Sequence, residues 1–317
     1  MTRTARWGAG LAVALGLWVS APASAQVQPQ PEVSLSYENV FAARVNPLGL
    51  VDIARFSLRI RLYESDSPIL TQNYIGFGIV PAVSAAWGRV GALVEVQPLS
   101  ILRLYARYDF MGYFSTFNLF SSFESANSEF SDTVVRDRTE IAGMENYATY
   151  GGILTAGATL QIALGPFAAR NLFRAIYSSY DVRDGDRVFY DPILDVLMPN
   201  DSWIAINEVD ALGLFDVDDF SFALGLRWSY VHAFYDDGHY APGEDPSDPP
   251  DNDIHRLGPI FAWTLMRDPG AMFDQPQIIV LAQWHLVHRY RTGADVNIGV
   301  PYLGLAFKFQ GDLLADH

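Results

Sequence analysis

Apolar and polar residues alternate with a period of two along most of this chain. Successive side chains of a β-strand point to opposite faces, so this alternation predicts strands with one apolar and one polar face. The clearest case is residues 54–63, where the even positions are apolar and the odd positions are Arg, Ser or Tyr. The pattern predicts twelve strands, at residues 32–45, 54–63, 74–84, 89–97, 103–114, 147–164, 167–180, 202–215, 220–234, 255–267, 276–291 and 300–309.

Two places leave the register or the strand count open. In residues 202–215, Glu208 and Asp210 share a parity with the neighbouring apolar residues, which predicts a bulge or a change of register. Residues 131–141 and 188–197 could form a further pair of strands. That pair would raise the count from twelve to fourteen.

The connecting segments alternate between long and short. The long ones are polar or acidic and cover residues 115–146, 181–201 and 236–254, whereas the short turns at 97–100, 165–166 and 216–219 contain Pro, Gly or Asp. In an antiparallel meander, alternate connections lie at the same end of the sheet. All three long segments are therefore expected at one end and the short turns at the other.

The last predicted strand has a distinctive ending. Tyr302 is followed by Gly304 and then by aromatic residues at alternate positions, Phe307 and Phe309. This ending resembles the C-terminal assembly signal of Gram-negative outer-membrane β-barrels, although residues 310–317 follow the final aromatic residue. The resemblance implies a transmembrane up-and-down barrel that is inserted by the barrel-assembly machinery and surrounded by outer-membrane lipid and lipopolysaccharide. Both possible strand counts are even, as such barrels require.

The first 25 residues have the features of a secretory signal peptide. Arg3 and Arg6 precede an apolar run over residues 7–19, and Ala23 and Ala25 flank a small residue at a cleavage site. The run is too short for a membrane anchor, which needs about 20 apolar residues. We therefore expect a signal peptide at 1–25 and a single barrel domain at 26–317.

Two features favour a membrane barrel over a soluble β-protein. Aromatic residues lie toward the ends of the apolar faces, as in the girdles of membrane proteins, at Phe110, Phe114, Trp228, Tyr230, Trp284 and Tyr290. The polar faces carry many Arg but a single lysine, Lys308, whereas solvent-exposed faces usually mix Lys with acidic residues. The chain has no Cys, which excludes disulfides and zinc–thiolate sites.

Charge is segregated when the faces are assigned. Most of the acidic residues lie in the loops, and the net charge of −15 argues against nucleic acid as a partner. The polar, inward faces collect Arg44, Arg89, Arg170, Arg174, Arg256 and Lys308, together with the predicted anion-binding set Arg55, Arg59, Arg61, Arg103, Arg107, Arg227, Arg289 and Arg291. Guanidinium groups bind carboxylate or phosphate through paired hydrogen bonds. The pattern thus predicts a porin-like channel for small anionic solutes.

Other functions stay open. The same arginines could pair with acids of residues 202–215 and of infolded loops, which would give a non-conducting structural or surface-interaction barrel. A lipid-processing hydrolase is a weaker alternative, because His232 and His288 are predicted near the outer rim but no Ser accompanies them. No second inward His supports a metal site at His285, and the acidic segment 236–254 lacks the spacing of a calcium loop. The sequence contains no cofactor motif.

Overall fold

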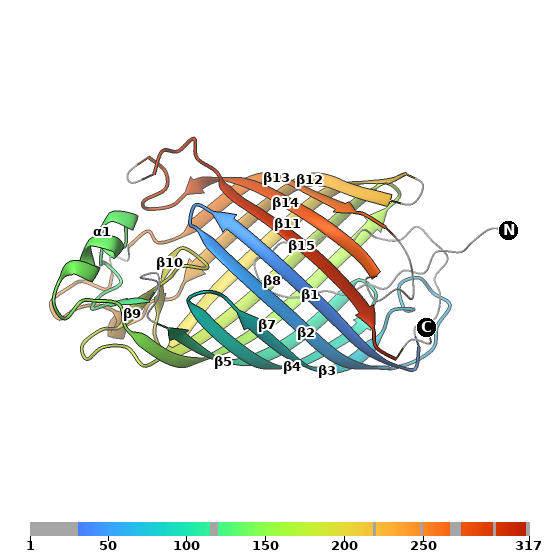
Figure 1. Cartoon of the computed structure of the whole chain (residues 1–317), viewed down its shortest axis with the longest axis horizontal. Helices are drawn as coiled ribbons and strands as arrows, with labels where there is room; N and C mark the ends of the chain where they lie inside the picture. The colour runs from blue at the N-terminus through green and yellow to red at the C-terminus, as the bar shows by residue number, and fades with distance from the viewer. Residues whose placement is uncertain are drawn as a thin grey trace.

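The computed structural model describes residues 31–114, 120–217, 220–247, 250–266, 274–293 and 296–314. Twelve antiparallel strands close into a barrel, as predicted (Figure 1). They are β1 (Val33–Val45), β2 (Gly49–Arg61), β3 (Tyr74–Val83), β4 (Trp87–Leu99), β5 (Leu102–Phe114), β7 (Ala148–Leu164), β8 (Phe167–Tyr180), β11 (Ser202–Val217), β12 (Phe220–Ala233), β13 (Ile254–Thr264), β14 (Asp274–Val287) and β15 (Tyr302–Asp312). Residues 1–25, where the signal peptide is predicted, lie outside the described ranges.

The barrel closes between its first and last strands. β1 and β15 pair over ten residues, from Ser36 with Asp312 to Val45 with Leu303. β15 continues three residues past the aromatic ending at Phe309, and the Asp312 carboxylate accepts a hydrogen bond from the Leu35 amide over 3.1 Å. The residues that follow the assembly signal therefore extend the seam of the barrel.

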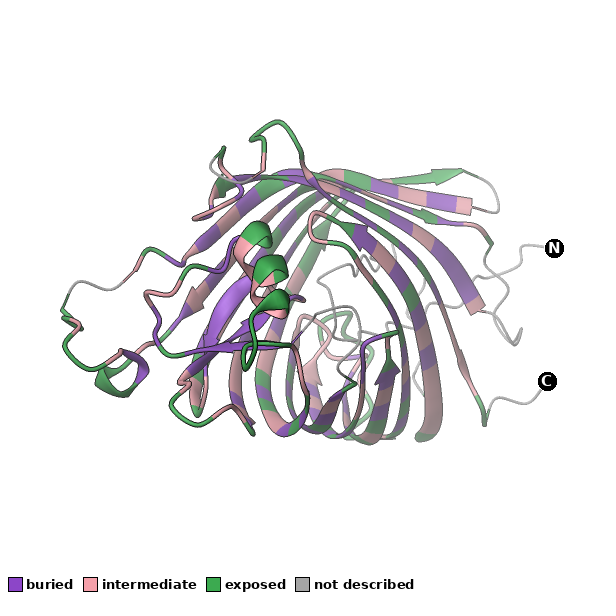
Figure 2. Ribbon diagram, turned by 60° about the vertical axis from the view of Figure 1, so that its left-hand side comes forward, coloured by how far each residue is buried: buried purple, intermediate pink, exposed green. Residues whose placement is uncertain are grey.

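The outer wall is apolar and the inward positions are buried. Buried and exposed bands alternate along each strand (Figure 2), and the exposed positions include Phe41, Leu58, Val94 and Leu305. A closed barrel satisfies every strand N–H and C=O group, which is what hydrocarbon requires. In the described ranges, no helix is long and apolar enough to cross a membrane. The closed ring and its apolar outer wall make the chain a transmembrane barrel, with its apolar face toward lipid.

Three short strands form a separate sheet at the end of the barrel opposite the termini (Figure 1). This plug sheet contains β6 (Ser121–Phe123), β9 (Val188–Asp191) and β10 (Val196–Pro199), in the order β10-β9-β6. Helix α1 (Asp132–Asp137) and the 3-10 turns η1 (Arg138–Glu140) and η2 (Asp237–His239) lie near it. The fourteen-strand alternative is therefore wrong: residues 131–141 are mostly helical, and residues 188–197 contribute to the plug sheet instead of the wall.

The plug sheet packs into the mouth of the barrel. Phe189, Val196 and Met198 belong to the same buried apolar cluster as Met111 and Ile204 of the wall. Such burial explains why the long segments do not form free loops, since their apolar residues find partners inside the mouth.

β11 corrects a second expectation. Ile204, Ile206, Glu208, Asp210 and Leu212 all point inward and are buried, and the strand pairs in unbroken register with both β8 and β12. The predicted bulge does not occur. The reason is that the barrel interior is apolar near the loop end. The isoleucines of β11 can therefore face inward on the same side of the strand as its acids.

Candidate functional site: the barrel interior

The interior has two zones. Toward the termini it is a charged belt of ion pairs, and toward the plug sheet it is largely apolar. The charged belt comprises Glu38, Arg55, Arg59, Glu95, Arg103, Arg107, Asp109, Arg170, Arg174, Glu208, Asp210, Arg227 and Lys308.

Glu95 on β4 is the centre of one half of the belt. Its carboxylate accepts from Arg103 Nε over 2.6 Å and from Arg59 Nε over 3.4 Å, and it pairs with Arg55. The hydroxyls of Ser57 and Tyr74 also donate to it, over 2.9 and 3.3 Å. One buried carboxylate therefore holds three guanidinium groups from two strands.

Asp210 on β11, four strands from β4 in the ring, has the same role in the other half of the belt. Arg227 donates to it through Nε and Nη2 over 2.6 and 2.8 Å, and Arg170 Nε donates over 3.0 Å. Beside it, Arg174 donates to Glu208 over 2.7 Å. Charged, doubly hydrogen-bonded pairs are the strong class of hydrogen bond, and buried charges are tolerated only when they are paired in this way.

A small void lies beside the arginines of the belt. A void of only about 10 Å³ lies among Arg55, Val80, Leu93, Arg103 and Tyr105. That is the space of about one water molecule.

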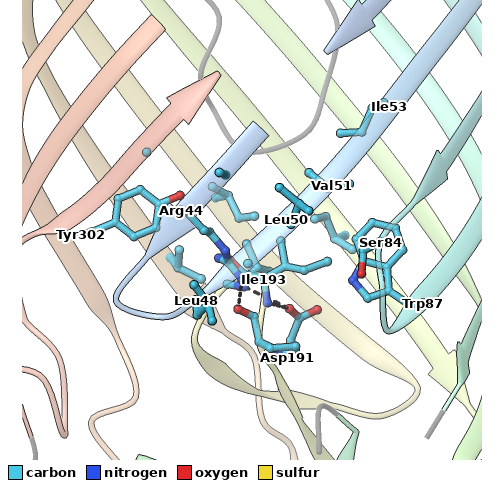
Figure 3. Close-up of a pocket in the computed structure, with 18 of the residues that line it drawn as sticks. Arg44, Leu48, Leu50, Val51, Ile53, Ser84, Trp87, Asp191, Ile193 and Tyr302 are labelled. Atoms are coloured by element: carbon cyan, nitrogen blue, oxygen red, sulfur yellow. Dashed lines mark hydrogen bonds between the residues drawn. The ribbon is translucent and has the colours of Figure 1, made fainter. Parts of the chain in front are cut away.

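Between the belt and the plug sheet lies a cavity of about 960 Å³. Its walls are mostly apolar side chains from the barrel and from the β9–β10 turn, among them Val51, Ile53, Met111, Ile193, Leu194, Met198, Ile206 and Val231. Figure 3 labels Val51, Ile53 and Ile193 of this set. A volume of this size is at the upper end of the range for small-molecule sites, which are commonly apolar with a few polar groups.

Three arginines at the cavity differ in their partners. Arg44 donates to the carbonyl oxygens of Pro192 and Ile193 and so holds the β9–β10 turn. Arg89 and Arg256 form no ion pair or hydrogen bond with any residue in the described ranges. Each lies over an aromatic ring instead: Arg89 is 5.5 Å from the ring centroid of Trp87, and Arg256 is 4.6 Å from that of Tyr302.

The plug sheet is attached to the barrel mouth through Asp195. Arg291 Nη2 donates to Asp195 over 3.0 Å and to Asp132 of α1 over 2.8 Å, and His288 Nε2 lies 3.1 Å from Asp195. Burial alone would raise the pKa of Asp195, but the hydrogen bond from His288 and the charge of Arg291 bring that pKa well below its usual value. Asp195 is therefore an anion held between two basic side chains.

The eight predicted anion-binding arginines do not form one site. Arg55, Arg59 and Arg103 meet at Glu95, whereas Arg107 pairs with Asp109 and Arg227 with Asp210. Arg61 pairs with the exposed Glu64. Arg289 and Arg291 lie beyond the end of β14 at Val287, so the predicted strand to residue 291 is too long. Arg289 donates to the carbonyl oxygens of Asn127 and Ser128 in the plug region. Their role in binding anions stays a prediction.

Three side chains at the mouth differ from expectation. His288 is buried against Asp195 instead of facing lipid, and its ring centroid lies 5.2 Å from that of His285, which therefore has an inward His neighbour. Tyr290 packs edge-on against Phe130, 4.8 Å between centroids, and not on the outer wall. These side chains lie inward because the loops after β14 fold over the mouth. The described residues contain no group of three or more His or acidic residues able to hold a metal.

His232, the candidate catalytic histidine of the hydrolase alternative, pairs with Asp253. Its Nδ1 lies 2.7 Å from Asp253 Oδ1, and Tyr230 donates to the same carboxylate over 3.1 Å. Within the described ranges, no Ser hydroxyl hydrogen-bonds to His232.

The sequence missed the apolar cavity. Its walls include the inward positions Val51 and Ile53, which pair with the inward Ala42 and Val40 of β1, where both faces of a strand are apolar. Apolar residues on both faces of β1 and β2 near the loop end were the sequence signal that could have indicated the cavity.

No protein-family model and no curated protein matches the chain. Three solved structures align with most of it. OccAB1 of Acinetobacter baumannii is 9% identical, with 91% of this chain and 99% of that chain covered and a TM-score of 0.37. The translocator domain of autotransporter NalP from Neisseria meningitidis is 6% identical, with 88% and 86% covered and a TM-score of 0.37. The outer membrane protein OprD from Pseudomonas aeruginosa is 9% identical, with 94% and 97% covered and a TM-score of 0.26.

Likenesses this distant carry no argument about function. The assignment of the fold rests on the molecule's own geometry: a closed antiparallel ring of an even number of strands, an apolar outer wall and an interior that holds the charges. By that construction the chain is an outer-membrane-type β-barrel.

Proposed function

We propose that the chain is a porin-like channel of the outer membrane that admits small anionic solutes. The observation that carries the proposal is the charge on the inner wall, where cations outnumber acids. The inward acids of the described strands include Glu38, Glu95, Asp109, Glu208, Asp210, Asp216 and Asp312, and the inward cations are Arg44, Arg55, Arg59, Arg61, Arg89, Arg103, Arg107, Arg170, Arg174, Arg227, Arg256 and Lys308. Such a wall lowers the energy of an anion in a low-dielectric tube.

A solute would enter from the loop end, where the cavity lies beneath the plug sheet. From there it would pass to the belt by exchanging with the carboxylates that now occupy the guanidinium groups. Arginine suits this exchange because its planar fork binds a solute carboxylate or phosphate with the geometry that it uses for Asp or Glu. In this proposal the plug sheet is the gate, and Asp195 with Arg291 and His288 holds it closed.

A second function has its own support. The close packing around Glu95 and the pairing of most belt arginines suit a non-conducting barrel whose ion pairs only stabilise the interior. The two functions predict opposite electrical behaviour, so one measurement separates them.

The test is the reversal potential of the purified barrel in a planar bilayer under a salt gradient. The wild type is compared with Arg291→Gln, which weakens the attachment of the plug sheet, and with Arg136→Gln as the matched control on the exposed part of α1, where Arg136 pairs with Asp137. We expect anion selectivity, with a larger conductance for Arg291→Gln than for the other two proteins. Cation selectivity, or no conductance in all three, would refute the channel.

The proposal also includes export through a signal peptide cleaved after Ala25. Mass spectrometry of the protein from outer-membrane fractions would then find a chain that begins at Gln26.

A further inference from the structure

We infer that the cavity under the plug sheet binds an amphipathic organic anion, with its carboxylate on Arg256 and its apolar body against the isoleucine, valine and methionine side chains of the wall. This inference rests on the proposed function, because it names the class of solute that the channel admits.

The first support is the difference in polarity between the cavity, whose wall is mostly apolar, and the belt, which is charged. A fully hydrated anion gains nothing from walls such as Ile53, Met111, Ile206 and Val231, because entry removes its water and offers no hydrogen bonds in return. An apolar body on the solute makes entry into the cavity favourable, because burial of its surface lowers the free energy in proportion to the area removed from water. The cavity therefore selects solutes that carry such a body.

The second support is the unpaired charge of Arg256. This side chain is only 8% exposed, its Nε is buried without a hydrogen-bond partner, and no described acidic oxygen lies within ion-pair distance. The other charged or titratable groups that act on it electrostatically are Tyr302, Glu208, Asp195 and Arg44. A buried guanidinium without a counter-ion is costly, whereas the belt arginines on both sides of the barrel have carboxylate partners. A solute carboxylate would supply the missing partner.

The third support is Arg89 on the opposite wall. β4 and β13 are six places apart in the ring of twelve strands, so Arg89 and Arg256 approach the cavity from opposite sides. Arg89 likewise has no ion pair or hydrogen bond with the described residues, and its charged neighbours are Arg107 and Asp109, which pair with each other. The lining of the cavity holds five arginines and two acids, Asp191 and Glu208. This excess of cations gives the cavity a positive potential, which attracts an anion before it docks.

The aromatic partners of the two arginines complete the site. Tyr302 lies beneath Arg256 and Trp87 beneath Arg89, so each guanidinium is held by a ring face and keeps its edge for hydrogen bonds. This leaves the donor fork of Arg256 directed at a ligand, and the cavity volume of about 960 Å³ accommodates a body larger than acetate.

The experiment uses the full-length barrel in lipid nanodiscs and isothermal titration calorimetry. Three probes separate charge from apolar body: cyclohexanecarboxylate has both, cyclohexylmethanol has the body alone and acetate has the charge alone. Empty nanodiscs give the partition of each probe into lipid, which is subtracted. We expect cyclohexanecarboxylate to bind at least tenfold more tightly than either of the others.

Two variants locate the site. Arg256→Met is expected to weaken carboxylate binding at least tenfold and to leave cyclohexylmethanol unchanged, whereas the control Arg136→Met on α1 changes neither. Should Arg256→Met fail to show the heat-dependent gel shift of a folded barrel, Arg89→Met on the opposite wall and the comparison of the three probes on the wild type keep the inference testable.

The outcomes separate this inference from the function on which it rests. Equal affinities for cyclohexylmethanol and cyclohexanecarboxylate would refute the role of the carboxylate. Tighter binding of acetate than of cyclohexanecarboxylate would refute the role of the apolar body. Anion-selective conductance without carboxylate binding would overturn the inference and leave the channel standing. Carboxylate binding that depends on Arg256 in a barrel that never conducts would support the site and refute the channel.

Discussion

Glu95→Gln tests how the charged belt stabilises the barrel. The substitution keeps the size of the side chain and removes its charge, while Arg55, Arg59 and Arg103 stay in place. Glutamine can accept one or two of the hydrogen bonds that the carboxylate now accepts. It cannot neutralise three buried guanidinium groups, which would then repel one another in a region of low dielectric.

The expected cost is large for a change of so few atoms. Removing one partner of a buried ion pair typically costs about 3–5 kcal/mol because the other charge is left uncompensated. The Glu95 side chain is fully buried and serves three arginines, so we expect a loss at the upper part of that range. Glu64→Gln is the matched control: Glu64 also pairs with an arginine, Arg61, but its side chain is 80% exposed. Exposed pairs contribute only about 0–1 kcal/mol.

The assay is reversible urea unfolding of the barrel in lipid vesicles, followed by tryptophan fluorescence. Glu95→Gln should lower the free energy of unfolding by several times the effect of Glu64→Gln. The double variant Glu95→Gln, Arg103→Met should recover part of the loss, because one uncompensated charge is gone. A Glu95→Gln barrel within about 1 kcal/mol of the wild type would refute this account, since the belt would then not depend on its central carboxylate.

Further predictions concern the plug sheet and the outer wall. Arg291→Gln should speed limited proteolysis between residues 181 and 201 several-fold, because Asp195 and Asp132 lose their shared partner; an unchanged cleavage rate would contradict this attachment. The lowered pKa of Asp195 implies that its contribution is complete above the unfolded value of about 3.9 and is lost only as the pH falls below it, so protection of the same segment should be constant from about pH 8 to pH 5. Val94→Arg, at the middle of β4 on the outer wall, should cost about 2–4 kcal/mol in the urea assay, whereas Val94→Leu should be nearly neutral.

The barrel itself could be read from local pattern. Alternation with period two fixes the face of each side chain once a strand forms, and it identified Leu58 and Val94 as outward and Arg55 and Arg103 as inward. The alternation of long and short connections placed the long segments at one end, where the plug sheet and α1 lie. These features depend on neighbours in sequence, so the sequence by itself determined them.

Partners across the barrel depend on tertiary structure. Glu95 and Asp210 each gather arginines from other strands through the register and tilt of the closed ring, which no local pattern contains. The closed ring also decided that Ile204 and Ile206 face inward with Glu208, because the mouth offers them the apolar surface of the plug sheet. Only the folded chain brings residues 120–123 and 188–199 into that mouth, and so only the folded chain creates the cavity and leaves Arg89 and Arg256 without acidic partners. The sequence contains the charges, but contacts between residues far apart in the chain determine which of these charges have ion-pair partners.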